Sequence, residues 1–482
     1  MPIDPEQFVL LLIIIFDMMA VLYIVFFERR NPSNATVWVL VLVLLPFIGF
    51  VSYLVFGQHY FKQKRFAIKA QKDLERIRQL IREQKTVIGR ARKEEVDGGA
   101  AFLQLVDMLL ANNGAVYLRG NEVRSFVTGR DKFDALLQAI QRAKHHVHME
   151  YYIIRDDELG RQIVSALTAK AREGVEVRLL YDVLGNDIPK EGYRELIEAG
   201  GKVSPFYKTL LPPSISLRVN YHNHRKIAVI DGTIGFVGGF NIGDEYLGKG
   251  PLGFWRDTAV EIRGEGAMAL QFRFLLDWRY ATKEELPIDS PYFPEAPEQG
   301  GATVQIVSGG PDSVWNPIKE EYLKLITIAK RHIYLQTPYF IPDQSVLDAL
   351  RIAAMSGVDV RIMFPCKPDH PFVYWASYSY VADLLDAGVR AFAYNNGFIH
   401  AKTATVDDVV SSIGTANWDI RSFRLNFETN AVIYDPEFAV RQRQHFEDDL
   451  MLSTEVTAER YRKRSLIIRL KEGISRLFSS VL

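Results

Sequence analysis

The sequence predicts an α/β protein with two homologous domains, each a mixed β-sheet flanked by helices, preceded by an N-terminal transmembrane helical hairpin. Three observations predict this fold class. Two apolar segments of about 20 residues stand at the N-terminus. From about residue 114, short β-branched runs alternate with helical patterns. Several stretches also recur after about 180 residues, which indicates an internal duplication.

The two apolar segments occupy residues 8–27 and 36–56, within residues 1–60. Each is long enough for one bilayer crossing, and the short polar link between them predicts a hairpin. The first lacks the basic region and the small-residue cleavage site of a signal peptide. Asp17, Pro46 and Gly49 weaken a simple span, so re-entrant or shallow insertion stays an alternative, as does a buried pair of soluble helices.

Residues 61–113 are expected to form a basic amphipathic helix and a linker. The link between the apolar segments holds only Arg29 and Arg30, whereas a dense run of basic residues follows the second segment. The positive-inside rule therefore predicts a multi-pass protein of the inner (cytoplasmic) membrane with its globular domains on the cytoplasmic side. The basic run also suits anionic headgroups, and comprises Lys62, Lys64, Arg65, Lys69, Lys72, Arg76 and Arg78.

The first globular domain is expected at residues 114–290 and the second at residues 301–455, on either side of a link rich in Pro and Glu. In the first domain, a β-α-β rhythm is predicted from a strand at 147–154, a helix at 159–173 and a strand at 175–182. The duplication is visible where residues 143–147, 174–178 and 197–200 recur in similar form at 329–333, 357–361 and 385–388.

Three histidines near the first of these strands, His145, His146 and His148, are interpreted as strand-end and surface residues. Cys366 is the only cysteine, so no intramolecular disulfide can form and a reducing compartment is permitted.

Each domain carries one copy of the pattern H-x-K-x-x-x-x-D. Both copies continue with a Gly seven residues after the Asp, then a small residue and an Asn. A single copy would be a weak motif, but two copies with the same continuation make chance remote. Residues 227–230 and 403–406 read as strands, in which positions i and i+2 share a face, so His and Lys should lie side by side. The residues are His224, Lys226, Asp231 and Asn241, and His400, Lys402, Asp407 and Asn417.

The motif pair resembles the HKD signature of the phospholipase D superfamily. In that superfamily two copies face each other across a pseudo-twofold axis and form one active site. Residues 255–258, 337–343 and 425–430 are similar to hallmarks of bacterial cardiolipin synthases, as is a membrane hairpin followed by a basic helix. The resemblance runs from about residue 30 to the end of the chain, and it implies two phospholipase D-type domains.

These residue types suit a phosphodiester substrate. Lys226 and Lys402 would offset the negative charge of a phosphoryl transition state, and Asn241 and Asn417 would donate hydrogen bonds to it. One histidine would attack phosphorus and form a phosphohistidine, while the other would protonate the leaving alcohol and then deprotonate the incoming one.

The near symmetry of the copies leaves open which histidine attacks, whereas the resemblance implies His224 as nucleophile and His400 as acid and base. Each imidazole needs a partner on its other nitrogen to set its tautomer. Asp257 and Glu428 occupy matching places after the two motifs and are assigned this role.

Asp231 and Asp407 end their strands and are expected to hold the local turn, although the superfamily counts them within its catalytic motif. A zinc site is the competing interpretation of His222 and His224, because an H-x-H pair can ligate zinc. No Cys supports it and the second copy has Phe398 at the equivalent place, so neither a metal nor another cofactor is expected.

The resemblance implies a cardiolipin synthase, a phosphatidyltransferase that moves a phosphatidyl group between two phosphatidylglycerol molecules and releases glycerol. Phosphatidylglycerol and other anionic membrane lipids are the expected partners, and the apolar segments support a lipid substrate. A formal net charge of zero argues against nucleic acid.

Two alternatives belong to other functional classes. A phospholipase D-type hydrolase of membrane phospholipids differs only in its acceptor, water, whose exclusion the sequence does not show. A membrane-bound scaffold with an inactive site is disfavoured because both copies keep His, Lys and Asp. The sequence predicts no oligomeric state.

Residues 456–482 are expected to form a basic amphipathic helix, because apolar and basic side chains alternate at helical spacing. Such a helix suits either an anionic membrane surface or packing on the catalytic body, and the pattern does not separate the two.

Overall fold

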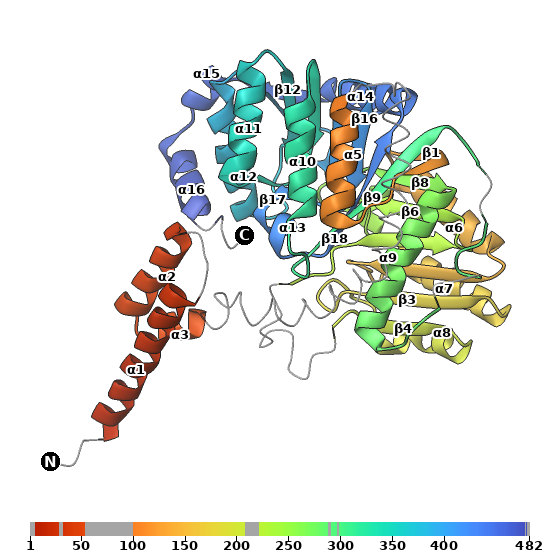
Figure 1. The fold of residues 1–482 in the computed structure, drawn as a ribbon, viewed down its shortest axis with the longest axis horizontal. Helices are drawn as coiled ribbons and strands as arrows, with labels where there is room; N and C mark the ends of the chain where they lie inside the picture. Colours follow the sequence, from red (N-terminus) through yellow and green to blue (C-terminus); the bar gives the residue numbers. More distant parts are fainter. Residues whose placement is uncertain are drawn as a thin grey trace.

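The computed structural model describes residues 5–27, 32–53, 100–207, 221–287, 291–295, 298–477 and 479. The basic stretch at 61–99 lies outside these residues. The described chain is dominated by one mixed sheet of fifteen strands with helices packed against it (Figure 1). The α/β class with a mixed sheet is therefore confirmed.

The strands of the sheet and the helices packed on it fall into two halves that follow one another in the sequence. The first half holds β1 (Leu118–Phe126), α6 (Gly129–Arg142), β2 (His146–Tyr151), α7 (Glu158–Arg172), β3 (Glu176–Tyr181), α8 (Arg194–Glu198), β4 (Lys202–Pro205), β5 (Lys226–Ile230), β6 (Ile234–Gly238), β8 (Ala259–Arg263) and α9 (Glu265–Thr282). The second half holds β9 (Ala302–Gly309), α10 (Pro317–Ile328), β10 (His332–Gln336), α11 (Gln344–Met355), β12 (Asp359–Pro365), α12 (Pro371–Leu385), β13 (Arg390–Tyr394), β15 (Thr403–Val406), β16 (Val410–Gly414), β18 (Glu428–Tyr434), α14 (Pro436–Leu450) and β19 (Ser453–Val456).

The strand order shows the duplication directly. Outward from the middle of the sheet, the first half runs β1, β8, β6, β5, β2, β3, β4, and the second runs β9, β18, β16, β15, β10, β12, β13, with β19 added at the edge. In both halves the strand that follows the motif histidine, β5 or β15, is antiparallel to its neighbour, β2 or β10. The halves join where β1 pairs antiparallel with β9.

An apolar seam holds the two halves against each other. Ile227 on β5 and Val260 on β8 share one buried cluster with Ile306 on β9, Ile413 on β16 and Ile433 on β18. Two small parallel pairs also join short segments, namely β7 (Trp255–Arg256) with β14 (Phe398–Ile399) and β11 (Phe340–Ile341) with β17 (Trp418–Asp419). The β7–β14 pair crosses between the halves, so the loops that carry the two motifs are fixed relative to each other.

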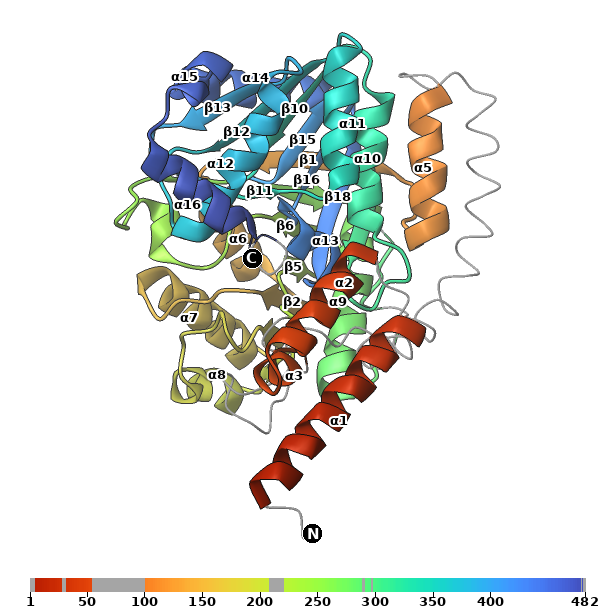
Figure 2. The same ribbon diagram turned by 90° about the vertical axis from the view of Figure 1, so that its left-hand side faces the viewer.

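The N-terminal segments form three helices, α1 (Pro5–Phe26), α2 (Pro32–Leu44) and α3 (Ile48–Ser52), drawn in red in Figures 1 and 2. The second predicted segment is interrupted, because Pro46 cannot donate a helical hydrogen bond and Phe47 has a φ of 69°. The Asp17 carboxylate is buried and accepts a hydrogen bond from the Phe47 N–H at 3.4 Å. No described helix is both long enough and apolar enough to cross a membrane, so the predicted transmembrane hairpin is not confirmed.

His146 and His148 are buried, and the prediction of surface histidines is wrong for both. They lie on β2, beside helix α9, where the Gln271 amide nitrogen is 2.8 Å from His148 Nδ1 and the Phe274 ring stacks on the His148 ring. Burial lowers the pKa of His146 to about 2. The whole strand is buried, which its mixed polar and apolar sequence does not indicate.

The motif aspartates Asp231 and Asp407 each stand directly after a strand and have a positive φ. Their carboxylates accept hydrogen bonds from backbone N–H groups at the start of the neighbouring strand. Asp407 accepts from Lys330, Arg331 and His332 at 2.7, 2.8 and 2.9 Å. Asp231 makes the matching bonds to residues 144–146. Both carboxylates are therefore engaged by backbone, in the turn position expected from the sequence.

We predict that Asp407→Ala lowers the free energy of unfolding by about 3 kcal/mol, because three backbone donors lose a charged acceptor. The matched control is Asp408→Ala. It has the same positive φ but sits in partly exposed ion pairs, so its loss should be about 1 kcal/mol. Denaturant titration of both variants measures the difference, and equal losses would contradict the role of the Asp407 carboxylate.

Candidate active site

The two motif histidines meet at the seam between the halves. β5 begins at Lys226 and β15 at Thr403, close to the strand bounds predicted from the sequence, so both histidines stand just before their strands. Each is held by backbone from the opposite half. The His224 N–H donates to the Phe427 carbonyl at 2.9 Å, and the His400 N–H donates to the Arg256 carbonyl at 2.7 Å.

Each imidazole contacts a carboxylate from the other half of the protein. His224 Nδ1 is 2.9 Å from a Glu428 carboxylate oxygen, and His400 Nδ1 is 2.6 Å from Asp257 Oδ2. All four side chains are buried. Since Nδ1 of each ring is held in this way, Nε2 is the nitrogen left to face a reacting atom.

Both motif lysines are buried beside the histidines. Lys226 Nζ donates to the His224 carbonyl at 2.7 Å, and Lys402 Nζ donates to the His400 carbonyl. Burial lowers the pKa of Lys226 to about 7, although Glu428 acts in the opposite direction. Burial likewise lowers the pKa of Lys402 to about 8, against the effect of Asp257. The pair places two cationic side chains beside the two imidazoles.

The two carboxylates have different electrostatic surroundings. Burial raises the pKa of Asp257 to about 6, against the opposing charge of Lys402. Burial also acts to raise the pKa of Glu428, but His224, Lys226 and the Thr415 hydroxyl outweigh it and hold that pKa below its ordinary value. The Thr415 hydroxyl donates to Glu428 at 2.5 Å. Glu428 is therefore the more firmly ionised of the two.

Thr415 and Gly239 occupy the same place after the two motifs, yet they serve their carboxylates differently. A Cβ atom on Gly239 would lie 2.0 Å from Asp257 Oδ1. The absence of a side chain at Gly239 therefore makes room for the carboxylate that contacts His400.

Burial favours the neutral form of both imidazoles. Burial lowers the pKa of His224 to about 4, because the effect of desolvation exceeds that of Glu428. Burial and the charges of Lys402 and Lys226 hold the pKa of His400 well below its ordinary value. A neutral imidazole with Nδ1–H on a carboxylate keeps the Nε2 lone pair that a nucleophile needs.

The asparagines do not occupy equivalent positions. Asn241 donates to the Tyr246 hydroxyl at 3.0 Å, and that hydroxyl is 3.3 Å from His400 Nδ1, so Asn241 reaches His400 through Tyr246. Asn417 Oδ1 is buried and has no hydrogen-bond partner among the described residues. The sequence treated the two as alike.

Aromatic rings that the sequence did not single out as site residues line both histidines. The Tyr152 ring lies 4.8 Å from the His224 ring, centroid to centroid, and the Trp255 ring lies 5.4 Å from the His400 ring. Trp255 stands in the 255–258 stretch that carries part of the family resemblance, whereas no pattern pointed to Tyr152 or Tyr246.

The histidine of the proposed zinc pair, His222, lies with Nδ1 3.6 Å from Asp182 Oδ1 and its ring against Tyr152. Within the part of the chain that the structure describes, no three His, Cys, Asp or Glu side chains converge in a way that could hold a metal ion.

Comparison with known proteins identifies close relatives. The family described as "Cardiolipin synthase, PLD-like domain" matches residues 136–252 and 322–450, and the family described as "Phospholipase_D-nuclease N-terminal" matches residues 15–58. The chain is 48% identical to the major cardiolipin synthase ClsA of Bacillus subtilis, over 99% of both chains. It is also 48% identical to a cardiolipin synthase of Staphylococcus aureus, over 95% of this chain and 93% of the relative.

Among solved structures, the phosphatidylserine synthase of Haemophilus influenzae matches with a TM-score of 0.61 at 14% identity, over 79% of this chain and all of that one (100%). This likeness shows a shared fold.

We predict that kcat/KM falls as the pH rises through about 7 to 8, because Lys226 and Lys402 lose their protons there and with them the charge that attracts an anionic substrate. The profile of kcat should begin to fall only at a higher pH than that of kcat/KM, since a bound phosphodiester anion favours the charged lysines. Initial rates on a micellar phospholipid between pH 5 and 10 provide the measurement, with circular dichroism to confirm an intact fold. A kcat/KM that stays level to pH 10 would refute the assignment.

Proposed function

The chain belongs to the cardiolipin synthases of the phospholipase D superfamily, and we propose that it transfers a phosphatidyl group between two phosphatidylglycerol molecules through a phosphohistidine on His224. The observation that carries this proposal is the pair of buried imidazoles, each held at Nδ1 by a carboxylate from the opposite half and flanked by a buried lysine. Asn241, Asn417, Asp257 and Glu428 serve the site by orienting these groups or the phosphoryl oxygens.

In the first step, His224 Nε2 attacks the phosphorus of the donor phosphatidylglycerol. A P–N bond forms, the P–O bond to the headgroup glycerol breaks, and His400 Nε2–H gives its proton to the departing glycerol oxygen. Lys226 and Lys402 offset the charge that develops on the phosphoryl oxygens.

In the second step, a hydroxyl group of the second phosphatidylglycerol attacks the same phosphorus. Its proton passes to His400 Nε2, the new P–O bond forms, and the P–N bond to His224 breaks. The products are cardiolipin and a regenerated site. Water in place of the second lipid would give phosphatidic acid.

Substrate binding favours the protonated form of His400 that the first step needs, with the proton taken up from solvent. In the free site the charges of Lys402 and Lys226 add to burial in lowering the His400 pKa. A bound phosphodiester anion opposes those lysine charges and so raises that pKa. Protonation of His400 is thereby coupled to the arrival of an anionic donor.

The choice of His224 as nucleophile is supported by the difference between the two carboxylates. Glu428 has a lowered pKa and accepts from Thr415 as well as contacting His224. Asp257 has a raised pKa of about 6. An ionised partner stabilises the positive charge that His224 acquires as it bonds to phosphorus, and Glu428 is the better suited.

The relatives imply a membrane-associated protein, and we propose that α1 to α3 provide the attachment to the inner membrane. Large apolar side chains such as Phe8, Leu22 and Val43 are exposed on these helices. The basic run after residue 61 supports a cytoplasmic position for the catalytic halves and contact with anionic lipids.

We predict opposite behaviour of His224→Asn and His400→Asn toward a 4-nitrophenyl phosphodiester, whose leaving group needs no proton. His400→Asn should lose about 10²- to 10⁴-fold with phosphatidylglycerol, yet still release a stoichiometric burst of nitrophenolate. His224→Asn should give no burst, because no P–N bond can form. Stopped-flow absorbance measures both, and a burst in His224→Asn alone would reverse the two roles.

The transferase reaction itself is tested with labelled phosphatidylglycerol in mixed micelles, in the presence of a chelator. We expect cardiolipin and free glycerol in equal amounts. Phosphatidic acid as the main product would establish the protein as a phospholipase D, and loss of turnover in the chelator would contradict the metal-free mechanism.

A further inference from the structure

The C-terminal helix α16 (Leu466–Leu477) packs on the catalytic body through its polar side. It follows α15 (Ala458–Arg462) and lies along α12 (Figure 2). Glu472 and Ser475 are the residues of α16 that are buried. Five apolar side chains are instead exposed, namely Leu466 (78%), Ile467 (68%), Leu470 (64%), Ile474 (41%) and Leu477 (80%). Packing on the catalytic body, one of the two alternatives from the sequence, is thus observed, but the apolar face points outward.

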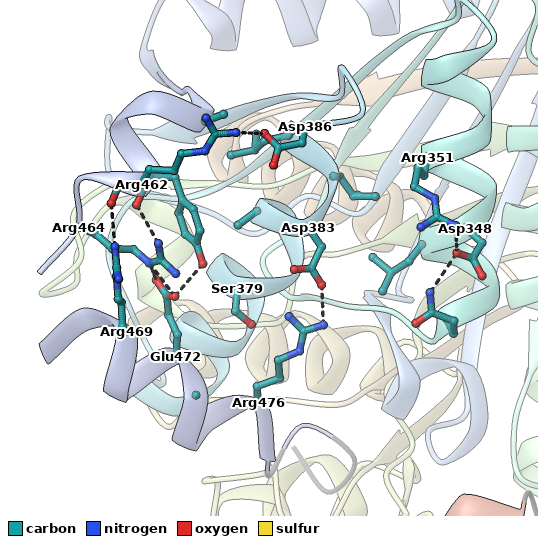
Figure 3. A pocket seen from close by; sticks show the side chains of 18 residues that line it. Asp348, Arg351, Ser379, Asp383, Asp386, Arg462, Arg464, Arg469, Glu472 and Arg476 are labelled. Atoms are coloured by element: carbon teal, nitrogen blue, oxygen red, sulfur yellow. Dashed lines mark hydrogen bonds and ion pairs between the residues drawn. The ribbon is translucent and has the colours of Figure 1, made fainter. Parts of the chain in front are cut away.

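Ion pairs fix this orientation of the helix. A cavity of about 690 Å³ lies between α11, α12, α15 and α16, and charged side chains dominate its lining (Figure 3). Arg476 contacts Asp383 at 2.5 Å, and Arg464 contacts Glu472 at 2.9 Å. Turning α16 to bury its leucines would break both pairs, and the buried Glu472 carboxylate would lose its partners Arg464 and Tyr461, which is unfavourable. The apolar face therefore has no place on this side of the body.

Basic residues border the apolar face on both sides. At about 100° per residue, the five apolar side chains fall within an arc of about 100°. Arg469 stands at one border of this arc and Lys471 at the other. Arg469 donates to the Arg462 carbonyl at 3.0 Å and has no carboxylate partner among the described residues. An apolar arc with a cation at each border is the pattern of a helix that lies in a membrane interface.

Charge also distinguishes this segment from the rest of the chain. Residues 458–477 contain seven Lys or Arg and two Glu, whereas the whole chain has a formal net charge of zero. A surface of anionic lipids complements this local excess, and each basic residue near such a surface strengthens attachment.

The border of the exposed face contacts α12, whose start stands near the active site. Lys471 Nζ is 5.3 Å from the Trp375 ring centroid on α12. One turn earlier, α12 begins beside Asp369, which accepts a hydrogen bond from Tyr339 and interacts electrostatically with Lys402. Phe372, in that first turn, is exposed (56%). The start of α12 therefore links α16 to the site.

We propose that α16 is an interfacial helix that inserts its apolar face into a bilayer containing anionic lipids and holds the active site close to the lipid surface. Arg469 and Lys471 lie at the headgroup level, and Phe372 extends the contact toward the site. The inference rests on the proposed function, because the substrate is then an anionic lipid of the same bilayer. A second copy of the chain fits less well as the occupant. The exposed face of a helix about 18 Å long has a smaller area than the roughly 800 Å² that each partner buries in a stable interface.

An environment-sensitive fluorophore on the full-length protein tests this contact. Cys366→Ser removes the only cysteine, and Leu470→Cys then allows labelling on the apolar face. The matched control is Val440→Cys on α14, which is also exposed. Vesicles of phosphatidylcholine with or without phosphatidylglycerol are added, and quenchers attached to the lipid acyl chains report depth.

We expect a blue shift and acyl-chain quenching at position 470 with phosphatidylglycerol vesicles, and neither at position 440. An unchanged spectrum at 470 with both vesicles would overturn the proposal. A blue shift that needs no lipid would also overturn it, and its dependence on protein concentration would separate a second copy from another part of the same chain.

Turnover separates failure of this inference from failure of the proposed function. Leu470→Glu/Ile474→Glu should raise the apparent KM for phosphatidylglycerol vesicles by about tenfold or more, with Val440→Glu unchanged. On short-chain phosphatidylglycerol below its micellar concentration, the unsubstituted protein, the double variant and the Val440→Glu control should have equal kcat/KM. Equal activity on vesicles would refute the role of α16, whereas absence of cardiolipin from either substrate in the unsubstituted protein would refute the proposed function.

Discussion

The structure depends on two hydrogen bonds that cross between its halves, His224 to Glu428 and His400 to Asp257. Neither imidazole is oriented by its own half, so the two halves must be held in one fixed relation for either histidine to work. The apolar seam, the β1–β9 pairing and the small β7–β14 pair all serve this requirement. Burial of the site then makes its lysines and carboxylates sensitive to one another, which a solvated site would not allow.

The two halves have the same strand order, but the site is asymmetric because a few equivalent positions carry different residues. Gly239 in one copy stands where Thr415 stands in the other. The first makes room for Asp257, and the second donates a hydrogen bond to Glu428. Two carboxylates in matching places thereby acquire different pKa values, which supports the different steps proposed for the two histidines.

Sequence patterns predicted the α/β class, the duplication and the side chains that meet at the site, because motif spacing and strand periodicity are local properties. They did not predict that each histidine pairs with the carboxylate of the other half, since pairing over 204 residues depends on how the halves pack. Burial of His146 and His148 was missed for the same reason. The orientation of α16 was also beyond the pattern, because helical periodicity shows that a helix has two faces and not which of them meets the protein.

The distance along the chain between each histidine and its carboxylate has a consequence for synthesis. When His224 emerges from the ribosome, its partner Glu428 is still 204 residues further along the chain. When Asp257 emerges, its partner His400 has likewise not yet been synthesised. A growing chain whose first helices already touch lipid would thus carry unoriented imidazoles only. On the proposed mechanism, a partial chain that ends before Glu428 has no oriented nucleophile, and we expect it to leave the surrounding lipid intact.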